Sequence, residues 1–348
     1  MTEEFLRRQI QATGAMPVGE FMRHCVSAYY AGRDPFGREG DFITAPEISQ
    51  MFGEMIGLWS AIAWQMMGAP QEVMLVELGP GRGTLMSDLL RAAGAMPDFR
   101  AALHIHLVET SPVLRERQRE ALAGTEAVWH EDLGELPDGP AIVIANEFFD
   151  ALPIEQYVYR TEGWHERMVT CRDAFAFTDG PAMSERRMAE LGAPDAKSGD
   201  VFEVNPDARR LVQALGQRFA EQKGVLLAID YGHDQSAVGD TLQAVRGHQP
   251  VPALQTPGES DLTAHVDFAA LIRAAEPAKA SPIAGQGSFL RRLGIELRAE
   301  RLAAAHPDKA EDLLAGCYRL INPGGMGTLF KVLALSSPDL PDLPGFAP

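Results

Sequence analysis

Three glycines at alternate positions are the clearest chemical signal in this 348-residue sequence. An apolar run ends in Glu77, and the glycines that follow it are Gly79, Gly81 and Gly83. Thr84 then opens a helix-like segment. This order is typical of a buried strand, a tight turn and a helix N-terminus, where bare backbone can lie against a ligand. The spacing is neither that of a dinucleotide turn nor that of a phosphate-binding loop, and the preceding acid favours a ligand with a cationic or hydroxyl group.

Polar residues after the next two predicted strands could hold further parts of the same ligand. Glu109 ends the segment 103–109, and an acid at this edge of an open α/β sheet can accept hydrogen bonds from both hydroxyls of a ribose. Asp132 and Leu133 follow the third strand, where an adenine contact is expected. Two plainer interpretations stay open, with Glu109 as a solvated strand-end acid and Asp132 as the cap of a turn. His130 is interpreted as structural.

A second polar group, Asn146, Glu147 and Asp150, follows the fourth predicted strand. The ends of the first and fourth strands flank the topological switch point of a doubly wound sheet, so we expect these carboxylates beside the ligand. Two such acids are costly unless a positive group pairs with them, and a guanidinium suits because it binds carboxylates in a bidentate manner. The alternative is an ordinary helix start, with Asn146 as the cap and the acids favoured by the helix dipole.

Two weaker candidates lie further along the chain. Asp230 ends the fifth predicted strand and could line the same pocket. His265 lies between Asp261 and Asp267 and could act as a base. A lone histidine near a helix start is more often structural, and that interpretation also stays open.

The order of the elements predicts an α/β fold with a doubly wound, mostly parallel sheet. Strand-like apolar segments alternate with helix-like segments, which is the pattern of strands linked by crossover helices. The strands are expected at 72–79, 103–109, 125–132, 141–146, 224–232 and 327–335. Later helices are expected near 267–276, 288–303 and 308–321, and a hairpin turn at 161–163.

The chain is predicted to have a helical N-terminal extension at 1–70, a ligand-binding domain at 71–335 and a Pro-rich tail at 336–348. Residues 154–222 interrupt the strand–helix alternation after the fourth strand, and beyond the hairpin they form a polar stretch with helix potential. Residues 233–262 are interpreted as one long loop, which is either functional or disordered. The tail is expected to lie outside the core.

The composition is that of a globular protein, with 46% hydrophobic and 23% charged residues and no apolar run long enough for a transmembrane helix. The net charge of −17 argues against autonomous nucleic-acid binding, which depends on neutralising phosphates. The three widely spaced cysteines predict a reducing compartment, with neither a disulfide framework nor a metal site. The N-terminal residues resemble neither a secretory signal nor a transit peptide, so we expect a bacterial cytoplasmic protein.

The glycine turn resembles the first motif of class I S-adenosyl-L-methionine (SAM) methyltransferases, and the chain as a whole is similar to the MidA family. The segments that carry this resemblance are 29–54, 76–85, 145–153, 230–232, 261–268, 286–295 and 326–333. It implies a class I SAM-methyltransferase fold with an N-terminal helical extension and an insertion after strand four. It also implies methylation of a protein arginine, on a respiratory complex I subunit of the 49-kDa type. Segment 277–287 is less strand-like than the family pattern leads us to expect.

The predicted roles follow from spacing and resemblance together. Residues predicted to bind SAM are Glu77, Gly79, Gly81, Gly83, Thr84, Glu109, Asp132 and Leu133. Residues predicted to act in catalysis are Glu147, Asp150 and Asn146. Two other functions stay open. One is a non-catalytic assembly chaperone that binds SAM for stability alone, and the other is a methyltransferase for a small molecule or an amide nitrogen.

Overall fold

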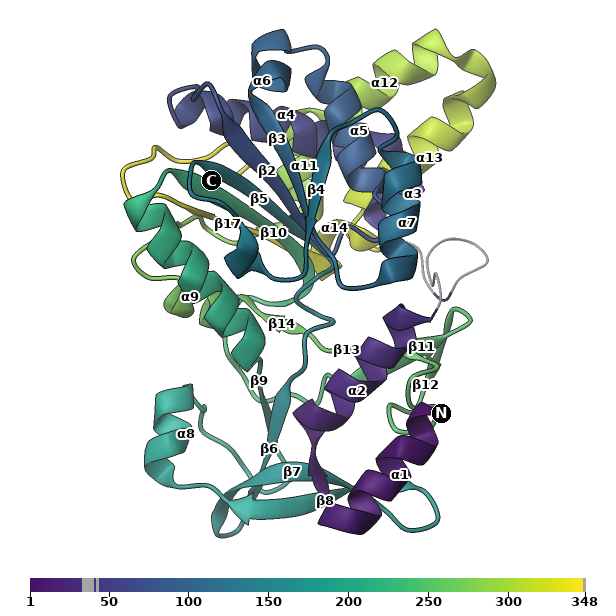
Figure 1. Cartoon of the computed structure of the whole chain (residues 1–348), viewed down its shortest axis with the longest axis vertical. Coiled ribbons are helices and arrows are strands. Elements are labelled where there is room, and N and C mark those ends of the chain that lie inside the picture. The colour runs from purple at the N-terminus through teal and green to yellow at the C-terminus, as the bar shows by residue number, and fades with distance from the viewer. Residues whose placement is uncertain (33–40, 42–43, 347–348) are drawn as a thin grey trace. The chain divides into compact units, whose positions relative to one another are not determined.

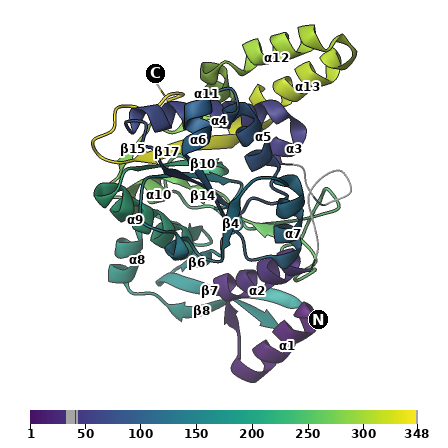
Figure 2. The same ribbon diagram turned by 45° about the horizontal axis from the view of Figure 1, so that its top comes forward.

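The computed structural model describes residues 1–32, 41 and 44–346, so part of the 29–54 motif lies outside the described residues. The chain forms two compact units. Unit 1 comprises Met1–Phe42, Phe149–Arg210 and His233–Leu271, and unit 2 comprises Ile43–Phe148, Leu211–Gly232 and Ile272–Pro348. Figures 1 and 2 show the chain from two directions. The division at residues 70 and 335 that the sequence suggests stays a prediction.

Unit 2 contains the mostly parallel sheet that the sequence predicts. Its strands run in the order β15-β17-β10-β5-β2-β3-β4, and the pairs from β10 to β4 are parallel. All six expected strands are present, as β2 (Val73–Leu78), β3 (Leu103–Val108), β4 (Ala127–His130), β5 (Ala141–Asn146), β10 (Gly224–His233) and β17 (Phe330–Ser336). The central strands are buried on both faces, which explains why they read as near-continuous apolar runs.

The strand order places the topological switch point between β2 and β5. The chain winds outward from β2 through β3 and β4, then returns to pair β5 with the other edge of β2. Leu78 at the end of β2 pairs with Ala145 near the end of β5. The carboxyl ends of these two strands therefore meet at one edge of the sheet, where ligands of doubly wound folds bind.

The doubtful strand before residue 286 is present but split. Two short segments, β15 (Lys279–Ala280) and β16 (Ala284–Gly285), pair antiparallel with β17. Pro282 lies between them and cannot donate to a strand ladder, which accounts for the interruption.

Helices of unit 2 complete the strand–helix alternation. They are α3 (Ala45–Ile48), α4 (Gln50–Met66), α5 (Thr84–Ala93), α6 (Pro97–Ala102), α7 (Pro112–Ala121), η1 (Leu133–Glu135), α11 (Gln286–Leu293), α12 (Ile295–Ala305), η2 (Pro307–Lys309), α13 (Ala310–Ile321) and α14 (Met326–Leu329). The helix expected over 288–303 is two helices, because Gly294 at φ 92° ends α11 in a left-handed conformation. Both α9 (Pro206–Glu221) and α10 (Phe268–Ala274) contain a unit boundary.

The expectation that the Pro-rich tail lies outside the core is wrong. Leu340, Leu343 and Phe346 are buried in the main apolar cluster of unit 2. The Phe346 ring packs against that of Phe289, with 5.2 Å between their centroids. Trp59 of α4 donates its indole N–H to the carbonyl of Pro344 at 3.2 Å. The prolines end regular structure, but the three apolar side chains between them are enough to hold the segment against the core.

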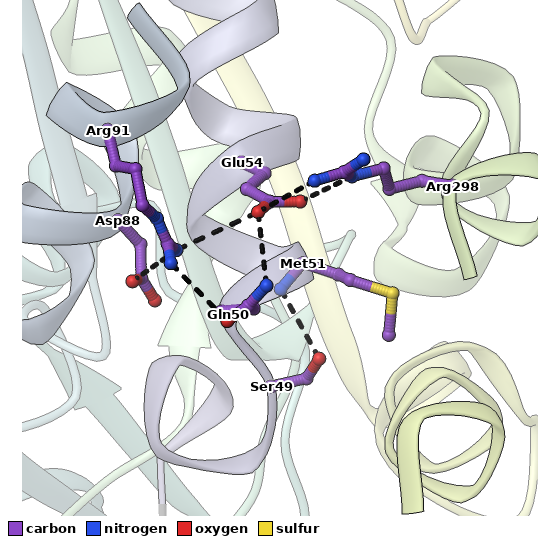
Figure 3. A network of polar contacts seen from close by, with 7 residues as sticks. All are labelled: Ser49, Gln50, Met51, Glu54, Asp88, Arg91 and Arg298. Atoms are coloured by element: carbon purple, nitrogen blue, oxygen red, sulfur yellow. Dashed lines mark hydrogen bonds and ion pairs between the residues drawn. The ribbon is translucent and has the colours of Figure 1, made fainter. Parts of the chain in front are cut away.

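A buried carboxylate anchors the α12–α13 pair, whose two helices lie side by side in Figures 1 and 2. Glu54 of α4 is 8% exposed as a side chain and accepts two hydrogen bonds from Arg298 of α12, at 2.7 and 3.1 Å. Figure 3 shows Gln50 and Arg91 on the other side of the same carboxylate. Bidentate pairing of this kind is geometrically specific, so it fixes the orientation of α12 on α4.

Unit 1 is built from antiparallel strands with helices at its N-terminal part. One sheet has the order β1-β7-β6-β9, with β8 paired to β7, and a second has the order β12-β11-β13. The elements are α1 (Thr2–Thr13), β1 (Met16–Pro17), α2 (Val18–Ala31), β6 (Glu155–Arg160), β7 (Gly163–Cys171), β8 (Phe175–Ala182), α8 (Glu185–Leu191), β9 (Val201–Val204), β11 (Gln243–Arg246), β12 (Gln249–Val251), β13 (Asp261–Thr263) and β14 (Val266–Asp267).

Two sequence-based expectations for unit 1 need correction, and one is confirmed. The hairpin at 161–163 is present between β6 and β7. The polar stretch beyond it was expected to favour helix, but β8 occupies residues 175–182 before α8 begins. Residues 233–262 are not one irregular loop, since they contain β11 and β12, and β13 begins at residue 261. Burial of Ala244 and Leu262 in an apolar cluster holds this small sheet in place.

Candidate functional site

The glycine turn lies between β2 and α5, as predicted. Gly79, Gly81 and Gly83 have φ values of 59°, 54° and 82°, a backbone region that side chains with a Cβ rarely adopt. A Cβ at Gly79 would also lie 2.9 Å from Cδ2 of Phe148. The turn therefore needs glycine both for its backbone conformation and for the ring packed against it, and its backbone stays bare.

Glu77 is a buried acid beneath the turn. It is 3% exposed, and within the described part of the chain its Oε2 has no hydrogen-bond partner. Burial raises the pKa of this carboxyl to about 8, with the backbone N–H of Met86 acting in the opposite direction. A buried acceptor without a partner costs free energy. The site therefore fits a ligand that brings a hydrogen-bond donor or a positive charge to Glu77.

Glu109 is joined to the glycine turn by a residue that the sequence analysis did not select. Gln118 of α7 is fully buried and donates its amide to the carbonyl of Gly81 at 2.8 Å and to Oε2 of Glu109 at 3.1 Å. The Gln118 carbonyl oxygen accepts a hydrogen bond from the indole of Trp129 at 2.8 Å. Glu109 itself is 8% exposed, and its other oxygen accepts from the backbone N–H of Ser111 at 2.7 Å. The interpretation of Glu109 as a solvated surface acid is therefore wrong.

Asp132 and Leu133 follow β4 after one intervening residue, in line with the expected order. Asp132 is exposed and accepts a hydrogen bond from the backbone N–H of Gly134 at 2.7 Å, which caps the short η1 helix. The turn-cap interpretation is confirmed, and contact with an adenine stays a prediction. His130 pairs with His106 through ring nitrogens 2.8 Å apart, in agreement with a structural role.

The segment after β5 does not start a helix. Residues 147–153 contain no helix, and β6 is the next regular element. Glu147 has φ 50°, which is uncommon for a residue with a side chain. Its backbone N–H donates to the carbonyl of Ile229 at 2.9 Å. The helix-start interpretation is therefore wrong, and strain of this kind is often found where a side chain is aimed at a ligand.

Glu147 receives hydrogen bonds from two directions. Its Oε1 accepts from the backbone N–H of Ala45 at 3.2 Å and from the side-chain amide of Asn146 at 3.3 Å. The other polar atom of that amide, Oδ1 of Asn146, is buried without a hydrogen-bond partner among the described residues. These two donors fix the direction of the Glu147 carboxylate.

Glu47 of α3 is a second residue that the sequence analysis missed. Its Oε1 accepts a hydrogen bond from the hydroxyl of Thr84 at 2.6 Å, and its Oε2 lies 3.9 Å from Nη1 of Arg82. The same short segment supplies Ala45 to Glu147. Two residues of α3, Glu47 and Ala45, thus contact the end of the glycine turn and the acid after β5.

Asp150 belongs to unit 1, whereas Asn146 and Glu147 belong to unit 2. It is 6% exposed, and its backbone carbonyl accepts from the N–H of Ala264 at 3.0 Å. Burial, and then the charges of Asp261 and Asp150, raise the pKa of the Tyr30 phenol well above its usual value. Tyr30 donates its hydroxyl to Asp261 at 3.0 Å. Asp150 therefore lies in a buried, acidic part of unit 1.

The two weaker candidates, Asp230 and His265, lie away from the end of β2 in sequence, and their roles stay predictions. Asp230 is fully buried and accepts a hydrogen bond from the backbone N–H of Tyr231 at 2.9 Å. His265 lines a cavity in unit 1, and burial lowers its pKa. Over residues 1–32, 41 and 44–346, the structure contains no cluster of three metal-ligating side chains. Within the same residues no helix is long and apolar enough to cross a bilayer.

Comparison with known proteins agrees with this geometry. Residues 55–284, more than half of the chain, match the family model described as "Putative S-adenosyl-L-methionine-dependent methyltransferase". The protein arginine methyltransferase NDUFAF7 homologue of Drosophila melanogaster is 36% identical, with 95% of this chain and 83% of that protein covered. Human NDUFAF7 is likewise 36% identical, with 95% and 82% covered.

Solved structures lead to the same family. A Burkholderia thailandensis protein bound to S-adenosyl-homocysteine has a TM-score of 0.86 at 28% identity, with 100% of this chain and 92% of that chain covered. A native structure from the same organism has a TM-score of 0.84 at 28% identity, with 99% and 94% covered. S-adenosyl-homocysteine is what remains of SAM after methyl transfer, and the resemblance to the MidA family is confirmed. The chain belongs to this family of SAM-dependent methyltransferases.

Proposed function

We propose that this methyltransferase acts on arginine side chains of a protein. The observation that carries the proposal is 36% identity, over 95% of the chain, to proteins named protein arginine methyltransferases. The acid after β5 is consistent with it, because a held carboxylate suits a guanidinium. The proposed partner is a respiratory complex I subunit of the 49-kDa type, as the resemblance to the MidA family implies.

In this proposal the cofactor lies over the glycine turn. Gly79, Gly81 and Gly83 would hold it with their bare backbone, and Thr84 begins the helix that follows the turn. The buried acceptor on Glu77 pairs with a donor of SAM, which is consistent with the unpartnered Oε2. Glu109 accepts the ribose hydroxyls, and its connection to Gly81 through Gln118 supports that role.

The adenine would be contacted by residues that follow β4. Asp132 and Leu133 lie at that strand end, and capping of η1 by Asp132 fixes the backbone there. A fixed backbone gives a base a defined edge to bind, so we assign the adenine to this turn.

Catalysis is assigned to Glu147, Asp150 and Asn146. Bound SAM supplies a methyl group on a positively charged sulfur. Arginine is a poor nucleophile because its charge is delocalised and its pKa exceeds ~12. In the proposal Glu147 binds the guanidinium and draws positive charge toward the nitrogens it contacts, Asn146 holds Glu147 in place, and Asp150 supplies a second carboxylate. Positioning of this kind lowers the barrier without covalent chemistry by the protein.

The test uses the purified full chain, SAM with a labelled methyl group, and a 49-kDa-type complex I subunit from the same source. The proposal predicts label on an arginine of that subunit, located by mass spectrometry. SAM binding and a stable complex with the subunit, without transfer, would support the non-catalytic chaperone instead. Label on an amide nitrogen or on a small molecule would support the remaining alternative.

We also propose that the protein works in a reducing compartment, such as a bacterial cytoplasm. Its three cysteines, Cys25, Cys171 and Cys317, are all free. Free, partly buried thiols persist most readily where disulfides are kept reduced. Alkylation of the protein in freshly lysed cells, followed by mass spectrometry, would report whether these thiols are reduced in the living organism.

A further inference from the structure

Unit 1 contains a cavity of about 200 Å³ that none of the proposed catalytic or cofactor-binding residues lines. This is larger than a cavity of ~150 Å³ that holds a benzene molecule. Its apolar wall includes Phe149, Ile154, Val238 and Leu271. Its polar wall consists of Glu203, Asn205, Arg209, His233, His265 and Asp267. The cavity thus has the mixed lining of a small-ligand site.

His233 provides the cavity with a hydrogen-bond acceptor. Its Nδ1 lies 2.7 Å from the carbonyl oxygen of Gln235. A carbonyl can only accept, so Nδ1 carries the proton, and Nε2 of the neutral ring is an acceptor. Within the described residues the ring makes no other hydrogen bond. A ligand that enters the cavity can therefore donate to Nε2 of His233.

Asp267 provides a second acceptor, with a negative charge. One oxygen accepts from the backbone N–H of Ala270 at 2.9 Å and the other from the hydroxyl of Ser236 at 2.5 Å. A carboxylate has about four acceptor sites, so Asp267 retains capacity for further donors. Asp267 and His233 both belong to the wall of the cavity.

The other charged groups of the wall are used within the protein. Glu203 accepts from Gln156 at 2.6 Å and from the backbone N–H of Thr241 at 3.0 Å. Arg209 donates from both terminal nitrogens to the carbonyl of Leu191, at 3.1 Å each. Burial raises the pKa of Glu203 and lowers the pKa of His265, so both shifts favour the neutral forms, and the acceptors that remain for a ligand are Asp267 and His233. A donor-rich cation fits this wall better than an anion does.

We propose that this cavity is a binding site for a basic group on an apolar stem, an alkyl guanidinium or an alkyl ammonium. The stem would pack against Phe149, Val238 and Leu271, and the cationic head would donate to His233 and Asp267. If the proposed function holds, the ligand is a basic side chain of the protein substrate. This one step rests on the proposed function. Occupation of the cavity does not itself depend on methyl transfer.

The test is direct binding of butylguanidinium to the purified full chain, measured by ligand-observed nuclear magnetic resonance. Butylurea, which is similar in shape but neutral, is the matched probe. The expected dissociation constant for butylguanidinium is on the order of 1 mM, as suits a ligand of this size. Butylurea should bind at least ~10-fold more weakly, because it lacks the charge that Asp267 pairs with. Equal binding of the two probes, or no binding of either, would overturn the proposal.

Three variants localise the binding. Asp267→Asn keeps a side chain that can cap α10 but removes the charge, and His233→Phe keeps the ring but removes the acceptor. Each should weaken butylguanidinium binding by ~10-fold or more. Ala237→Phe fills the cavity from an exposed position and should abolish binding. Ala304→Phe, on the exposed face of α12, is the matched control and should change nothing. Binding that survives Ala237→Phe would place the probe elsewhere and refute the assignment.

Failure of this inference is distinguishable from failure of the proposed function. Calorimetric titration with SAM tests the cofactor site of the same preparations and should give the wild-type affinity for all four variants. If arginine methylation fails but butylguanidinium binds with the expected variant pattern, the cavity remains a cation site. If methylation succeeds and the probe does not bind, only the cavity assignment is wrong.

Discussion

The ends of β2 and β5 lie next to each other in unit 2, yet their conformations are determined in different ways. At the end of β2, three glycines with positive φ determine the conformation locally, and Glu77 lies two residues before the first of them. At the end of β5, Glu147 adopts φ 50° without being glycine, and its carboxylate is held by Ala45, 102 residues earlier in the chain. One short sequence motif can thus determine a site where backbone contacts a ligand. A site that aims a carboxylate depends on distant residues.

The two strand ends are also joined. Phe148 packs its ring against Gly79, and Glu47 of α3 binds Thr84 while Ala45 of the same helix binds Glu147. If the comparison is right, substitutions at the β2 end should lower SAM affinity. Substitutions at the β5 end should lower turnover, and substitutions in α3 should affect both.

The largest effect is expected for Gly81→Val. A β-branched residue at φ 54° costs about 1–3 kcal/mol of strain, and its side chain would cover backbone that is proposed to contact the ligand. SAM binding, measured by calorimetry, should fall at least ~100-fold. Gly124→Val is the matched control, since Gly124 also has positive φ, at 84°, with nothing within 4 Å of an added Cβ. Gly124→Val should lower the melting temperature but keep SAM affinity. SAM affinity that is unchanged in Gly81→Val would remove the glycine turn from the site.

At the β5 end, Glu147→Gln and Asp150→Asn should leave SAM affinity within about twofold. Each should slow single-turnover methyl transfer by ~10- to 100-fold, because the substrate guanidinium loses a charge-assisted partner. Glu162→Gln, in an exposed turn, is the control and should keep full activity. Wild-type turnover in both site variants would refute the role of these acids.

Glu109→Ala tests the proposed contact with the ribose, at the end of β3 next to β2. It removes the proposed acceptor of the ribose hydroxyls and the partner of Gln118, and should weaken SAM binding by about 1–3 kcal/mol. The loss should appear mainly in the KM for SAM. The exposed Glu126→Ala should have no effect. A loss below about 0.3 kcal/mol would show that Glu109 does not bind the cofactor.

Glu47→Ala tests the link between the two strand ends. It removes the acceptor for Thr84, so SAM affinity should fall by about 1 kcal/mol, or ~5-fold. Because α3 also supplies Ala45 to Glu147, turnover at saturating SAM should fall by a similar factor. Glu72→Ala, with a side chain 82% exposed, is the control. An effect on one quantity alone would mean that α3 does not couple the two ends.

The smallest effect expected is the release of a fraction of a proton from Glu77 when SAM binds. Burial raises the pKa of Glu77 to about 8 from 4.5, so the folded state favours its protonated form. Its contribution to stability is therefore full below pH 4.5 and is lost as the pH rises through about 8. A cationic group of SAM would favour the carboxylate, so binding near neutral pH should release part of a proton. Calorimetry in two buffers of different ionisation enthalpy measures this release, and Glu77→Gln should abolish it. Proton uptake by the wild type would contradict the pairing.

Much of the fold could be predicted because buried parallel strands read as apolar runs, and Val73–Leu78 and Ala141–Asn146 are clear examples. Strand β8 was missed because none of its residues is buried and the segment lacks an apolar run. The tail was misread because three prolines obscured the spacing of Leu340, Leu343 and Phe346.

The site could be predicted where its geometry is local. Gln118 was missed because α7 is dominated by charged residues, although its spacing four residues after the buried Leu114 marks it as inward-facing. Glu47 could not have been selected, since only the folded chain brings α3 to Thr84. The roles assigned to the residues chosen from the sequence stay predictions.

The most direct test of the central claim is single-turnover transfer of a labelled methyl group from SAM to a 49-kDa-type complex I subunit. The reaction should be run with the wild type and with Glu147→Gln side by side, and the labelled residue located by mass spectrometry. We expect label on an arginine, at a rate reduced ~10- to 100-fold in the variant, with SAM affinity equal in both. Label on any other residue type, or equal rates in the two proteins, would contradict it.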